Sequence, residues 1–525
     1  MRYAEFEWSI PDRFNMAAAT CGRRGDDLAL LYLPAAGEPR RYTFADMDTL
    51  SSRFANALEA LGVARGDRVA VLLPQRPEVP VAHLAAWKLG AVSLPLTTLF
   101  GPEALRHRLG EASPRALVCE AGELDRVREA CDGLDLAVVA VDAPAVLPAG
   151  CHGFEELLAA AAPTRRVADT AADDPAFLLF TSGTTGPAKG ALHAHRMLLG
   201  HLPGVELPHN LFPQPGDLMW TPADWAWIGG LMDVLFPAWY HGVGVVAAQG
   251  RFDPERAWRF CAEYGVRNTF LPPTALRMMR EVYRPELARG LALRSVGSGG
   301  EQLGEDVLAW GKEALGVTIS EFYGQTEVNL VVGNCPALFD PVPGSMGRAI
   351  PGHRVAILRP DGSIADPGER GEIAVALPDP VAFLGYWNKP EATAEKTRDG
   401  WVHTGDEGYV DENGFFFYTS RSDDVINSAG YRIGPGEIEQ CLATHPAVLL
   451  TAVVGEPDPV RGEAVVAYVE LREGVHPGPE LAAELQQYVK SRLAAYLYPR
   501  RIEFVGALPR TTTGKIMRSA LRRKN

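Results

Sequence analysis

Short apolar runs alternate with helical patterns along the first third of the chain. Arg68–Leu73, Ala116–Cys119, Ala137–Val141 and Ala176–Phe180 have the length and apolar content of buried strands. Between such runs lie stretches like Thr49–Leu61, where apolar residues recur at helical spacing. This alternation predicts α/β layers built on largely parallel sheets.

The pattern changes between about residues 342 and 418. Two short apolar stretches, Arg354–Leu358 and Gly371–Val375, have the length of strands, and the turn residues Pro360–Gly362 lie between them. Short strands separated by turn signals predict a small β-rich subdomain here.

A polar segment at residues 420–424 precedes about a hundred residues with their own strand and helix patterns. Ala452–Val454 and Ala464–Leu471 are predicted strands, and apolar residues recur at every fourth position in one helix, at Leu481, Leu485, Val489 and Leu493. We therefore predict an α/β protein with two domains. Residues 1–420 form a large N-terminal domain of two α/β layers plus the β-rich subdomain, and residues 421–525 form a small α+β C-terminal domain.

Composition narrows the class of protein. The chain has 525 residues, 47% of them hydrophobic and 22% charged, which is typical of a soluble enzyme with more than one domain. A net charge of −14 argues against nucleic-acid binding, which needs a basic surface. The seven cysteines are scattered and show no C-x-x-C spacing, so neither disulfides nor a zinc site is expected.

Location follows from the same observations. Scattered cysteines fit a reducing cytoplasm, and the first residues lack the apolar segment of a secretory signal. The longest apolar region, residues 226–248, contains Asp233, Pro237 and His241. It is expected to form a buried helix and strand, and no stable membrane insertion is expected.

One loop carries the clearest chemical signal. Residues 181–190 read TSGTTGPAKG, directly after the predicted strand that ends at Phe180 and before a plausible helix. Glycines let backbone N–H groups approach an anion, and the threonines, serine and lysine add hydroxyl donors and a positive charge. We interpret the segment as a loop that holds nucleotide phosphates. It does not match the P-loop pattern, because Gly190 follows Lys189. A flexible linker is the alternative interpretation.

Four further blocks accompany this loop in order along the chain. They are Gly297–Glu301, Glu321–Glu327, Trp401–Asp406 with Ser420–Asp423, and Pro509–Lys515. With these five blocks, the chain resembles the adenylate-forming superfamily of acyl-CoA synthetases, peptide-synthetase adenylation domains and luciferases. Asn427–Pro435 and Tyr323–Glu327 look most like short- to medium-chain acyl-CoA synthetases.

The resemblance implies a reaction in two steps that uses ATP, Mg²⁺ and CoA. A carboxylate attacks the α-phosphate of ATP to give acyl-AMP and pyrophosphate, and the CoA thiol then displaces AMP. The implied catalytic residues are Thr326 on the α-phosphate, Glu327 on Mg²⁺ and Lys515 on the carboxylate and α-phosphate. The ATP- and AMP-binding positions that it implies are Thr181, Ser182, Gly183, Thr184, Thr185, Lys189, Gly300, Glu301, Gln302, Glu321, Tyr323, Gly324, Gln325, Asp406, Arg421 and Arg432.

The C-terminal domain of this family moves between the two steps. Asp423 matches the hinge, at the polar connection between the predicted domains. The positions expected to face CoA are Ser428, Ala429, Gly430 and Tyr431.

The acyl group is predicted from one small set of residues. Acetate-specific relatives carry a tryptophan at the position of Gly324, so glycine there predicts a longer acid, and Trp227, Ile228 and Gly229 are expected to line the same pocket. We expect a medium-chain aliphatic acid. An aromatic or branched acid, a ligase that loads a carrier-protein thiol, and a non-catalytic nucleotide or acyl-AMP binding protein are the alternatives. The expected partners are the acid and CoA, and the oligomeric state stays open.

Overall fold

The computed structural model describes residues 6–22, 25–181, 188–300, 303–421, 424, 426–428, 431–458, 462–492, 497–511 and 515–522. Two compact units divide the chain. Unit 1 comprises Met1–Gly183, Pro187–Arg354 and Ala376–Val402, and unit 2 comprises Thr184–Gly186, Val355–Val375 and His403–Asn525. Unit 2 thus includes two segments that precede residue 421, and the predicted division at that residue stays a prediction.

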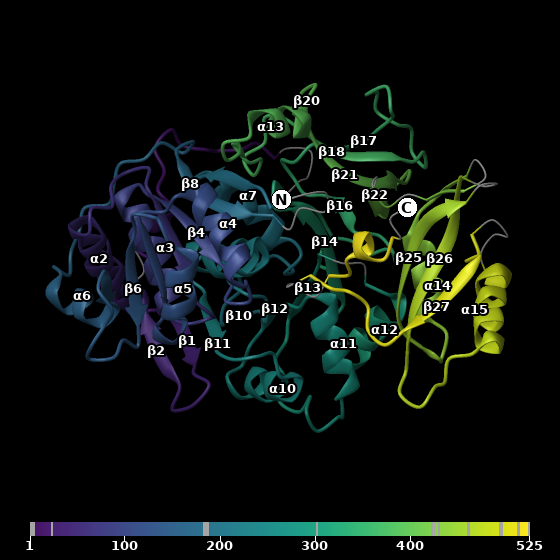
Figure 1. The fold of residues 1–525 in the computed structure, drawn as a ribbon, viewed down its shortest axis with the longest axis horizontal. Coiled ribbons are helices and arrows are strands. Elements are labelled where there is room, and N and C mark those ends of the chain that lie inside the picture. Colours follow the sequence, from purple (N-terminus) through teal and green to yellow (C-terminus); the bar gives the residue numbers. More distant parts are fainter. Residues whose placement is uncertain are drawn as a thin grey trace. The chain divides into compact units, whose positions relative to one another are not determined.

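The first sheet of unit 1 contains all four strands predicted from the early apolar runs. Its core strands are parallel, because they are connected through helices on its faces. The strand order is β19 (Gly385–Tyr386), β9 (Gly190–Ala194), β8 (Pro175–Phe180), β4 (Val92–Leu96), β3 (Arg68–Leu72), β5 (Ala116–Glu120), β6 (Ala137–Val141) and β7 (Cys151–Gly153) (Figure 1).

The second sheet of unit 1 is parallel in its centre and antiparallel at its ends. Its strands, in order, are β16 (Gly347–Ala349), β15 (Val328–Gly333), β14 (Ile319–Gln325), β13 (Ser295–Ser298), β12 (Asn268–Phe270), β10 (Leu218–Trp220), β11 (Gly244–Ala248), β1 (Leu28–Leu33) and β2 (Arg40–Thr43). The antiparallel hairpin of β14 and β15 carries the predicted block Glu321–Glu327.

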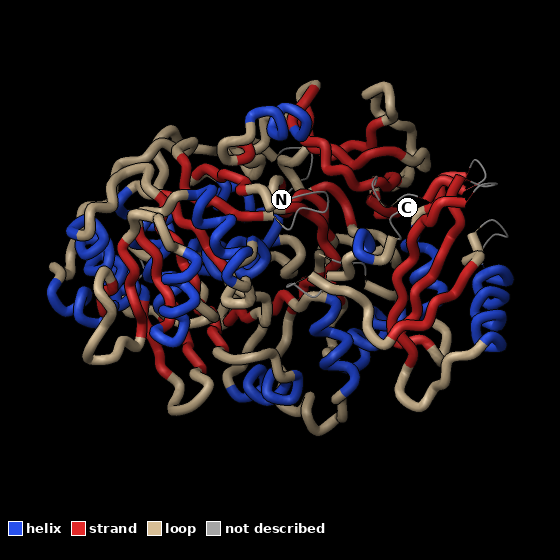
Figure 2. The backbone as a smooth tube through the Cα atoms, viewed as in Figure 1, coloured by secondary structure: helices blue, strands red, loops and turns tan. Residues whose placement is uncertain are grey.

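Helices cover both sheets of unit 1 and fill the space between them (Figure 2). The described ones are α1 (Met16–Thr20), α2 (Phe44–Ala60), α3 (Glu78–Leu89), α4 (Pro102–Ala112), α5 (Leu124–Ala130), α6 (Phe154–Ala160), α7 (Met197–Glu206), α8 (Ile228–Gly230), α9 (Phe236–Tyr240), α10 (Pro254–Glu263), α11 (Pro273–Glu281), α12 (Glu305–Ala314) and α13 (Pro390–Lys396). Helix α2 begins before the predicted start at residue 49, because Thr43 and Asp46 form a capping box.

Three apolar clusters define the layers of unit 1. The largest joins residues of both sheets through α3, which is buried on almost every side. A second cluster packs α4 and α5 on the outer face of the first sheet, and a third packs α10 and α11 on the outer face of the second. The structure therefore confirms the predicted pair of α/β layers.

Residues 226–248 form the buried helix and strand predicted from their sequence. A π-helical segment, η3 (Leu231–Leu235), leads into α9 and then into β11, and nearly all of these residues are buried. None of the helices in the described ranges is long and apolar enough to cross a membrane.

Unit 2 contains the predicted C-terminal strands and part of the predicted β-rich subdomain, of which residues 342–354 and 376–402 fall in unit 1. The subdomain strands are β17 (Val355–Leu358), β18 (Gly371–Ala376), β21 (Trp401–Val410) and β22 (Phe415–Arg421). The C-terminal elements are β23 (Ile426–Ser428), β24 (Tyr431–Ile433), α14 (Pro435–Ala443), β25 (Val448–Asp458), β26 (Gly462–Leu471), α15 (Pro479–Arg492) and β27 (Arg501–Val505). Helix α15 lies beside β27 and buries Leu485 and Val489, as its pattern predicts, whereas Leu493 lies outside the described residues (Figure 1).

Gly347 allows a close approach of two strands in the second sheet. Its φ is +101°, and a Cβ atom there would lie 2.2 Å from the carbonyl group of Gly333. Gly344 also has a positive φ, of +78°, but has open space at its Cβ position. Substitutions at these two glycines therefore distinguish the effect of backbone strain from the effect of steric overlap.

We expect Gly347→Ala to lower the melting temperature clearly more than Gly344→Ala. Both substitutions add backbone strain of roughly 1–3 kcal/mol, but only the first also pushes a methyl group into backbone atoms. Thermal unfolding followed by circular dichroism measures both. Equal melting temperatures for the two variants would contradict the close approach.

Candidate active site

The predicted phosphate loop connects two antiparallel strands. It leaves β8 at Phe180, and Gly190 stands opposite Phe180 where the chain returns in β9. Thr181 donates its backbone N–H to the Lys189 carbonyl over 2.9 Å, which closes the base of the loop. The expected helix directly after the loop is wrong, because residues 190–194 pair with β8 as a strand and α7 begins only at Met197. Ser182, Gly183, Thr184 and Thr185 lie outside the described residues.

Lys189 and Glu327 both contact Tyr386, a residue that lies outside the sequence motifs. Tyr386 lies on β19, the edge strand that pairs with β9, and the Lys189 ammonium lies 5.2 Å from the centre of its ring. The Tyr386 hydroxyl donates a hydrogen bond to the Glu327 carboxylate. One side chain, that of Tyr386, thus contacts both the lysine of the predicted phosphate loop and the predicted metal ligand Glu327.

Thr326 and Glu327 form the turn between β14 and β15. Gln325 and Val328 are paired across this hairpin, so the two residues between them stand at its tip. Glu327 is largely buried, and its carbonyl accepts the Phe383 N–H over 2.9 Å. The turn therefore holds the Glu327 backbone as well as its carboxylate.

Tyr323, Gly324 and Gln325 lie at the end of β14, and all three are partly exposed. Gln325 accepts a hydrogen bond of 3.0 Å from Lys396. A Cβ atom on Gly324 would lie 2.4 Å from Oδ1 of Asn329. Glycine is required at position 324 because the Asn329 amide fills the space that a side chain would take. The sequence indicates a different reason for this glycine, namely that it leaves a tunnel open for the acyl group.

Glu321 lies further back on β14, beside the predicted adenine segment. Its carboxylate accepts the Leu303 N–H over 3.3 Å, and burial raises the pKa of the Glu321 carboxyl to about 7. Gly300 has a φ of +88°, which glycine adopts without strain. Glu301 and Gln302 lie outside the described residues.

The predicted acyl residues follow a buried tryptophan. Trp225 is almost completely enclosed, whereas Trp227, Ile228 and Gly229 keep partial exposure at the start of α8. The Trp227 ring lies 6.0 Å from that of Phe100 in an edge-to-face contact. Ile228 and Gly229 stand one turn before η3.

The predicted ribose and CoA residues belong to unit 2. Asp406 on β21 is largely buried, and it is paired in register with Arg421 on β22. The Asp406 N–H donates a hydrogen bond to the Thr404 hydroxyl, and that hydroxyl donates a hydrogen bond to the Ile373 carbonyl. Ser428 is buried on β23.

Several predicted site residues of unit 2 are described only in part or not at all. Arg432 and Tyr431 lie on β24, opposite Asn427 and Ser428, and Arg421 lies on β22. Only the backbone of these three residues is described. Asp423, Ala429 and Gly430 lie outside the described residues.

Lys515 is exposed, and its backbone is bonded to Thr511. Its N–H donates to the Thr511 hydroxyl over 3.1 Å, and its carbonyl accepts the Thr511 N–H over 2.7 Å. These bonds fix the backbone of Lys515, whose side chain extends from an exposed residue. An exposed lysine suits a group that must reach a substrate.

The donor set around Glu327 fits one particular kind of metal site. Within the described ranges, no group of three or more His, Cys, Asp or Glu side chains is placed to hold a metal ion. Mg²⁺ is commonly held by one or two carboxylates together with substrate phosphates. The oriented carboxylate of Glu327, close to the loop that carries Lys189, fits such a shared site.

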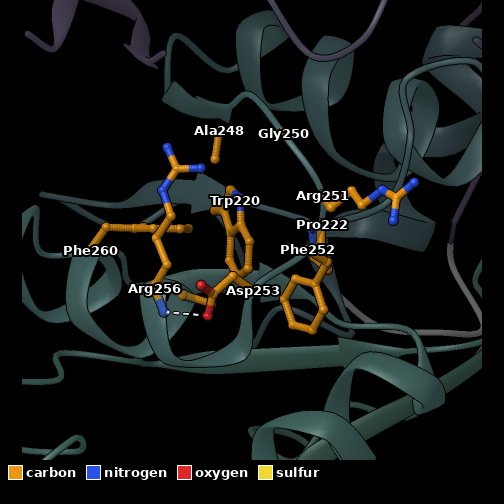
Figure 3. Close-up of a pocket in the computed structure, with 10 residues that line it drawn as sticks. Trp220, Pro222, Ala248, Gly250, Arg251, Phe252, Asp253, Arg256 and Phe260 are labelled. Atoms are coloured by element: carbon orange, nitrogen blue, oxygen red, sulfur yellow. Dashed lines mark hydrogen bonds between the residues drawn. The ribbon is translucent and has the colours of Figure 1, made fainter. Parts of the chain in front are cut away.

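A small surface pocket lies apart from these residues, at the ends of β10 and β11. Figure 3 shows Trp220, Phe252 and Phe260 in its wall, with Asp253 accepting the Arg256 backbone N–H over 3.0 Å. The Arg256 guanidinium donates hydrogen bonds to the backbone carbonyls of residues 33, 34 and 249. None of the predicted site residues lines this pocket.

Comparisons with known proteins agree with this arrangement of motifs. The family model of AMP-binding enzymes matches residues 17–387, and the model of their C-terminal domain matches residues 437–515. The mitochondrial acyl-coenzyme A synthetase ACSM3 of Rattus norvegicus is 35% identical, over 99% of this chain and 92% of its own. The acetyl-coenzyme A synthetase of Bacillus subtilis is 34% identical, over 99% of this chain and 94% of its own. The crystal structure of Brucella canis acyl-CoA synthetase is 34% identical, with a TM-score of 0.78 over 99% of this chain and 97% of that one.

The fold and these matches define an adenylate-forming enzyme. The chain belongs to the AMP-binding enzyme family, as one of its AMP-forming acyl-CoA synthetases, which are ligases. ATP and CoA are accordingly its co-substrates.

We expect Tyr386→Phe to raise the KM for ATP with Mg²⁺ about tenfold. The substitution removes the hydroxyl that orients Glu327 but keeps the ring beside Lys189, and a hydrogen bond to a charged group contributes about 1.5–3 kcal/mol. Steady-state kinetics at varied ATP and Mg²⁺ measure the effect. Tyr283→Phe, at a distant aromatic cluster, is the matched control. An unchanged KM in Tyr386→Phe would show that this hydroxyl does not support nucleotide binding.

We expect Glu321→Gln to become more stabilising as the pH rises. The pKa of this carboxyl is about 7 in the folded protein, against an ordinary value of 4.5, so the wild type loses stability as the pH rises from about 4.5 to 7. Glutamine keeps an acceptor for Leu303 but cannot ionise. The difference in melting temperature between variant and wild type should therefore grow from pH 5 to pH 8. A difference that is the same at both pH values would contradict the raised pKa.

Proposed function

We propose that the enzyme joins a carboxylic acid larger than acetate to CoA through an acyl-adenylate. The observation that carries this proposal is the arrangement of Lys189, Tyr386 and Glu327, which joins a phosphate-loop cation to a metal-binding carboxylate. Adenylation brings two anions together, so positive charge and donors must be in place before the reaction. In the first step the acid's oxygen bonds to the α-phosphorus and pyrophosphate leaves.

Glu327 would hold Mg²⁺ together with phosphate oxygens of ATP. When bound, the ion supplies positive charge that offsets the charge of the phosphates. The residues of this chain do the remaining work. Lys189 and Thr181 face the leaving phosphates, and Thr326, at the tip of its hairpin, donates to the α-phosphate.

Lys515 is proposed to orient the acid's carboxylate during adenylation. A lysine ammonium placed between the carboxylate and the α-phosphate reduces the repulsion between them and holds the two at reacting distance. The exposed position of Lys515 and the bonds that hold its backbone to Thr511 support this role. Lysine suits it because the charge stands at the end of a long flexible chain.

Five residues are proposed to bind the adenosine and its α-phosphate. Asp406 accepts hydrogen bonds from the ribose hydroxyls, which a carboxylate with two oxygens can do. Glu321 and Gly300 face the adenine. Arg421 and Arg432 lie near the ribose and phosphate.

The second step is proposed to use the other face of the C-terminal domain. The CoA thiol attacks the acyl carbonyl carbon and AMP leaves with the acid's oxygen. Ser428–Tyr431 would contact the pantetheine arm, and Asp423 would serve as the hinge that changes which face meets the active site.

The acid itself is proposed to be of medium length. Trp227, Ile228, Gly229 and Gly324 remain the proposed acyl-binding residues, and their partial exposure supports this role. Medium-chain aliphatic acids come first, with aryl or branched acids as the alternative. We also propose a cytoplasmic location, supported by seven cysteines that the structure leaves unpaired.

The test is acid-dependent formation of AMP and acyl-CoA from ATP, Mg²⁺ and CoA. We expect turnover with a medium-length acid above that with acetate, and Lys515→Ala should lower the adenylation rate at least a hundredfold while its melting temperature stays unchanged, because that residue is exposed. The matched control is Lys312→Ala, in the last turn of α12.

Other outcomes would change the proposal. Acyl-AMP without thioester would favour a carrier-protein thiol as the acceptor. A maximum at acetate would contradict the larger acid. No acid-dependent release of pyrophosphate with any acid would contradict the proposed reaction.

A further inference from the structure

A buried carboxyl lies behind the proposed acyl-binding residues. Asp233 is in the middle of η3 and is only 4% exposed, and its neighbours Met232 and Val234 are completely buried. Burial raises the pKa of the Asp233 carboxyl well above its ordinary value. An apolar helix would be more stable without this acid, and π-helical turns occur frequently at functional sites.

Asn329 and His201 hold this carboxyl in one orientation. The His201 Nδ1–H donates to the Met197 carbonyl over 2.7 Å, because a carbonyl can only accept. Nε2 of the neutral ring is then an acceptor, 3.2 Å from Nδ2 of Asn329. The same amide nitrogen donates to Oδ1 of Asp233 over 2.5 Å.

This chain of bonds leaves two oxygen atoms available. Both amide hydrogens of Asn329 are used, so its Oδ1 is free to accept, and Asp233 keeps Oδ2. Among the described residues neither oxygen has a hydrogen-bond partner, and Asp233 and Asn329 keep 4% and 5% of their surface exposed. Two buried polar side chains with a fixed geometry and unpaired oxygen atoms are expected to bind a ligand through hydrogen bonds.

The two oxygens lie against the two glycines of the proposed acyl site. A Cβ atom on Gly229 would lie 2.9 Å from the Phe270 ring and 3.6 Å from Oδ2 of Asp233, and one on Gly324 would lie 2.4 Å from Oδ1 of Asn329. Both glycines are partly exposed. The surface that a substrate acyl group would meet there therefore includes two polar oxygens beside the Phe270 ring, where the sequence predicts a hydrocarbon tunnel.

We propose that the acid substrate carries a hydroxyl group that bonds to Asp233 and Asn329. A hydroxyl suits this pair because it both donates and accepts: it accepts the proton on Oδ2 of the neutral Asp233 carboxyl and donates its own to Oδ1 of Asn329. This inference rests on the proposed function, since it names the class of acid for the same site.

The test compares matched acids in the adenylation step alone. Hexanoate, octanoate and benzoate are each measured beside their monohydroxy derivatives, with the hydroxyl moved along the chain or ring, and pyrophosphate release gives kcat/KM. We expect one hydroxylated acid to exceed its parent by about tenfold or more, because a site with buried polar groups rejects an analogue that leaves them unpaired.

Two variants of one residue then identify the group responsible. Asp233→Leu has nearly the same shape without polar atoms, so the preference for the hydroxylated acid should disappear while the parent acid is still adenylated. Asp233→Asn mimics the neutral carboxyl, since its amide can donate where Oδ2–H did, and should retain the preference. Melting temperatures of both variants show whether they fold.

Each outcome decides the inference. It is overturned if the wild type prefers the parent acid at every position, which needs no variant, or if Asp233→Leu keeps the preference. A preference for amino-substituted acids that Asp233→Asn abolishes would also overturn it, because it requires an ionised carboxylate and an ammonium group. Turnover of the parent acids without preference overturns this inference alone, whereas no turnover of any acid contradicts the proposed function as well.

Discussion

The hydrogen bond from Tyr386 to Glu327 joins the parts of the site that we propose bind phosphate. Three segments far apart in the sequence meet there: the loop that ends at Lys189, the hairpin tip at Glu327 and the edge strand β19. Two of them belong to the first sheet of unit 1 and one to the second. The geometry that nucleotide phosphates require therefore depends on how the two sheets are packed on the shared apolar cluster.

That packing also explains the glycines beside the site. Gly229 and Gly324 lie where another side chain occupies the Cβ position, Phe270 in the first case and Asn329 in the second. Because glycine has no side chain, a neighbouring side chain can approach its backbone and place its own chemical groups there. Asn329 is polar and is bonded to Asp233, so we propose that Gly324 determines which surface the substrate meets as well as how much room it has.

The sequence predicts most elements of the fold because buried parallel strands are continuous apolar runs and α15 buries one regular face. It indicates an anion-binding role for Lys189 because glycine, threonine and lysine in one loop have few structural uses besides anion binding, and it indicates a role for Glu327 only through the family resemblance. It does not predict Tyr386, whose role comes from β19 pairing with β9 across nearly two hundred residues. It misses the Asp233 and Asn329 pair for the same reason, since nothing local in η3 or β15 indicates that they meet. Residues 190–194, directly after the phosphate loop, form a strand and not the expected helix, because pairing with β8 overrides the short local pattern.

The central claim is that the acid's own oxygen bonds to the α-phosphorus of ATP. Turnover of an acid labelled with oxygen-18 in its carboxylate, with ATP, Mg²⁺ and CoA, followed by mass spectrometry of the products, tests this directly. An acyl-adenylate leaves one labelled oxygen in AMP at each turnover, because the thiol attacks the acyl carbon and breaks the carbon–oxygen bond. Unlabelled AMP, or label in inorganic phosphate, would contradict the account.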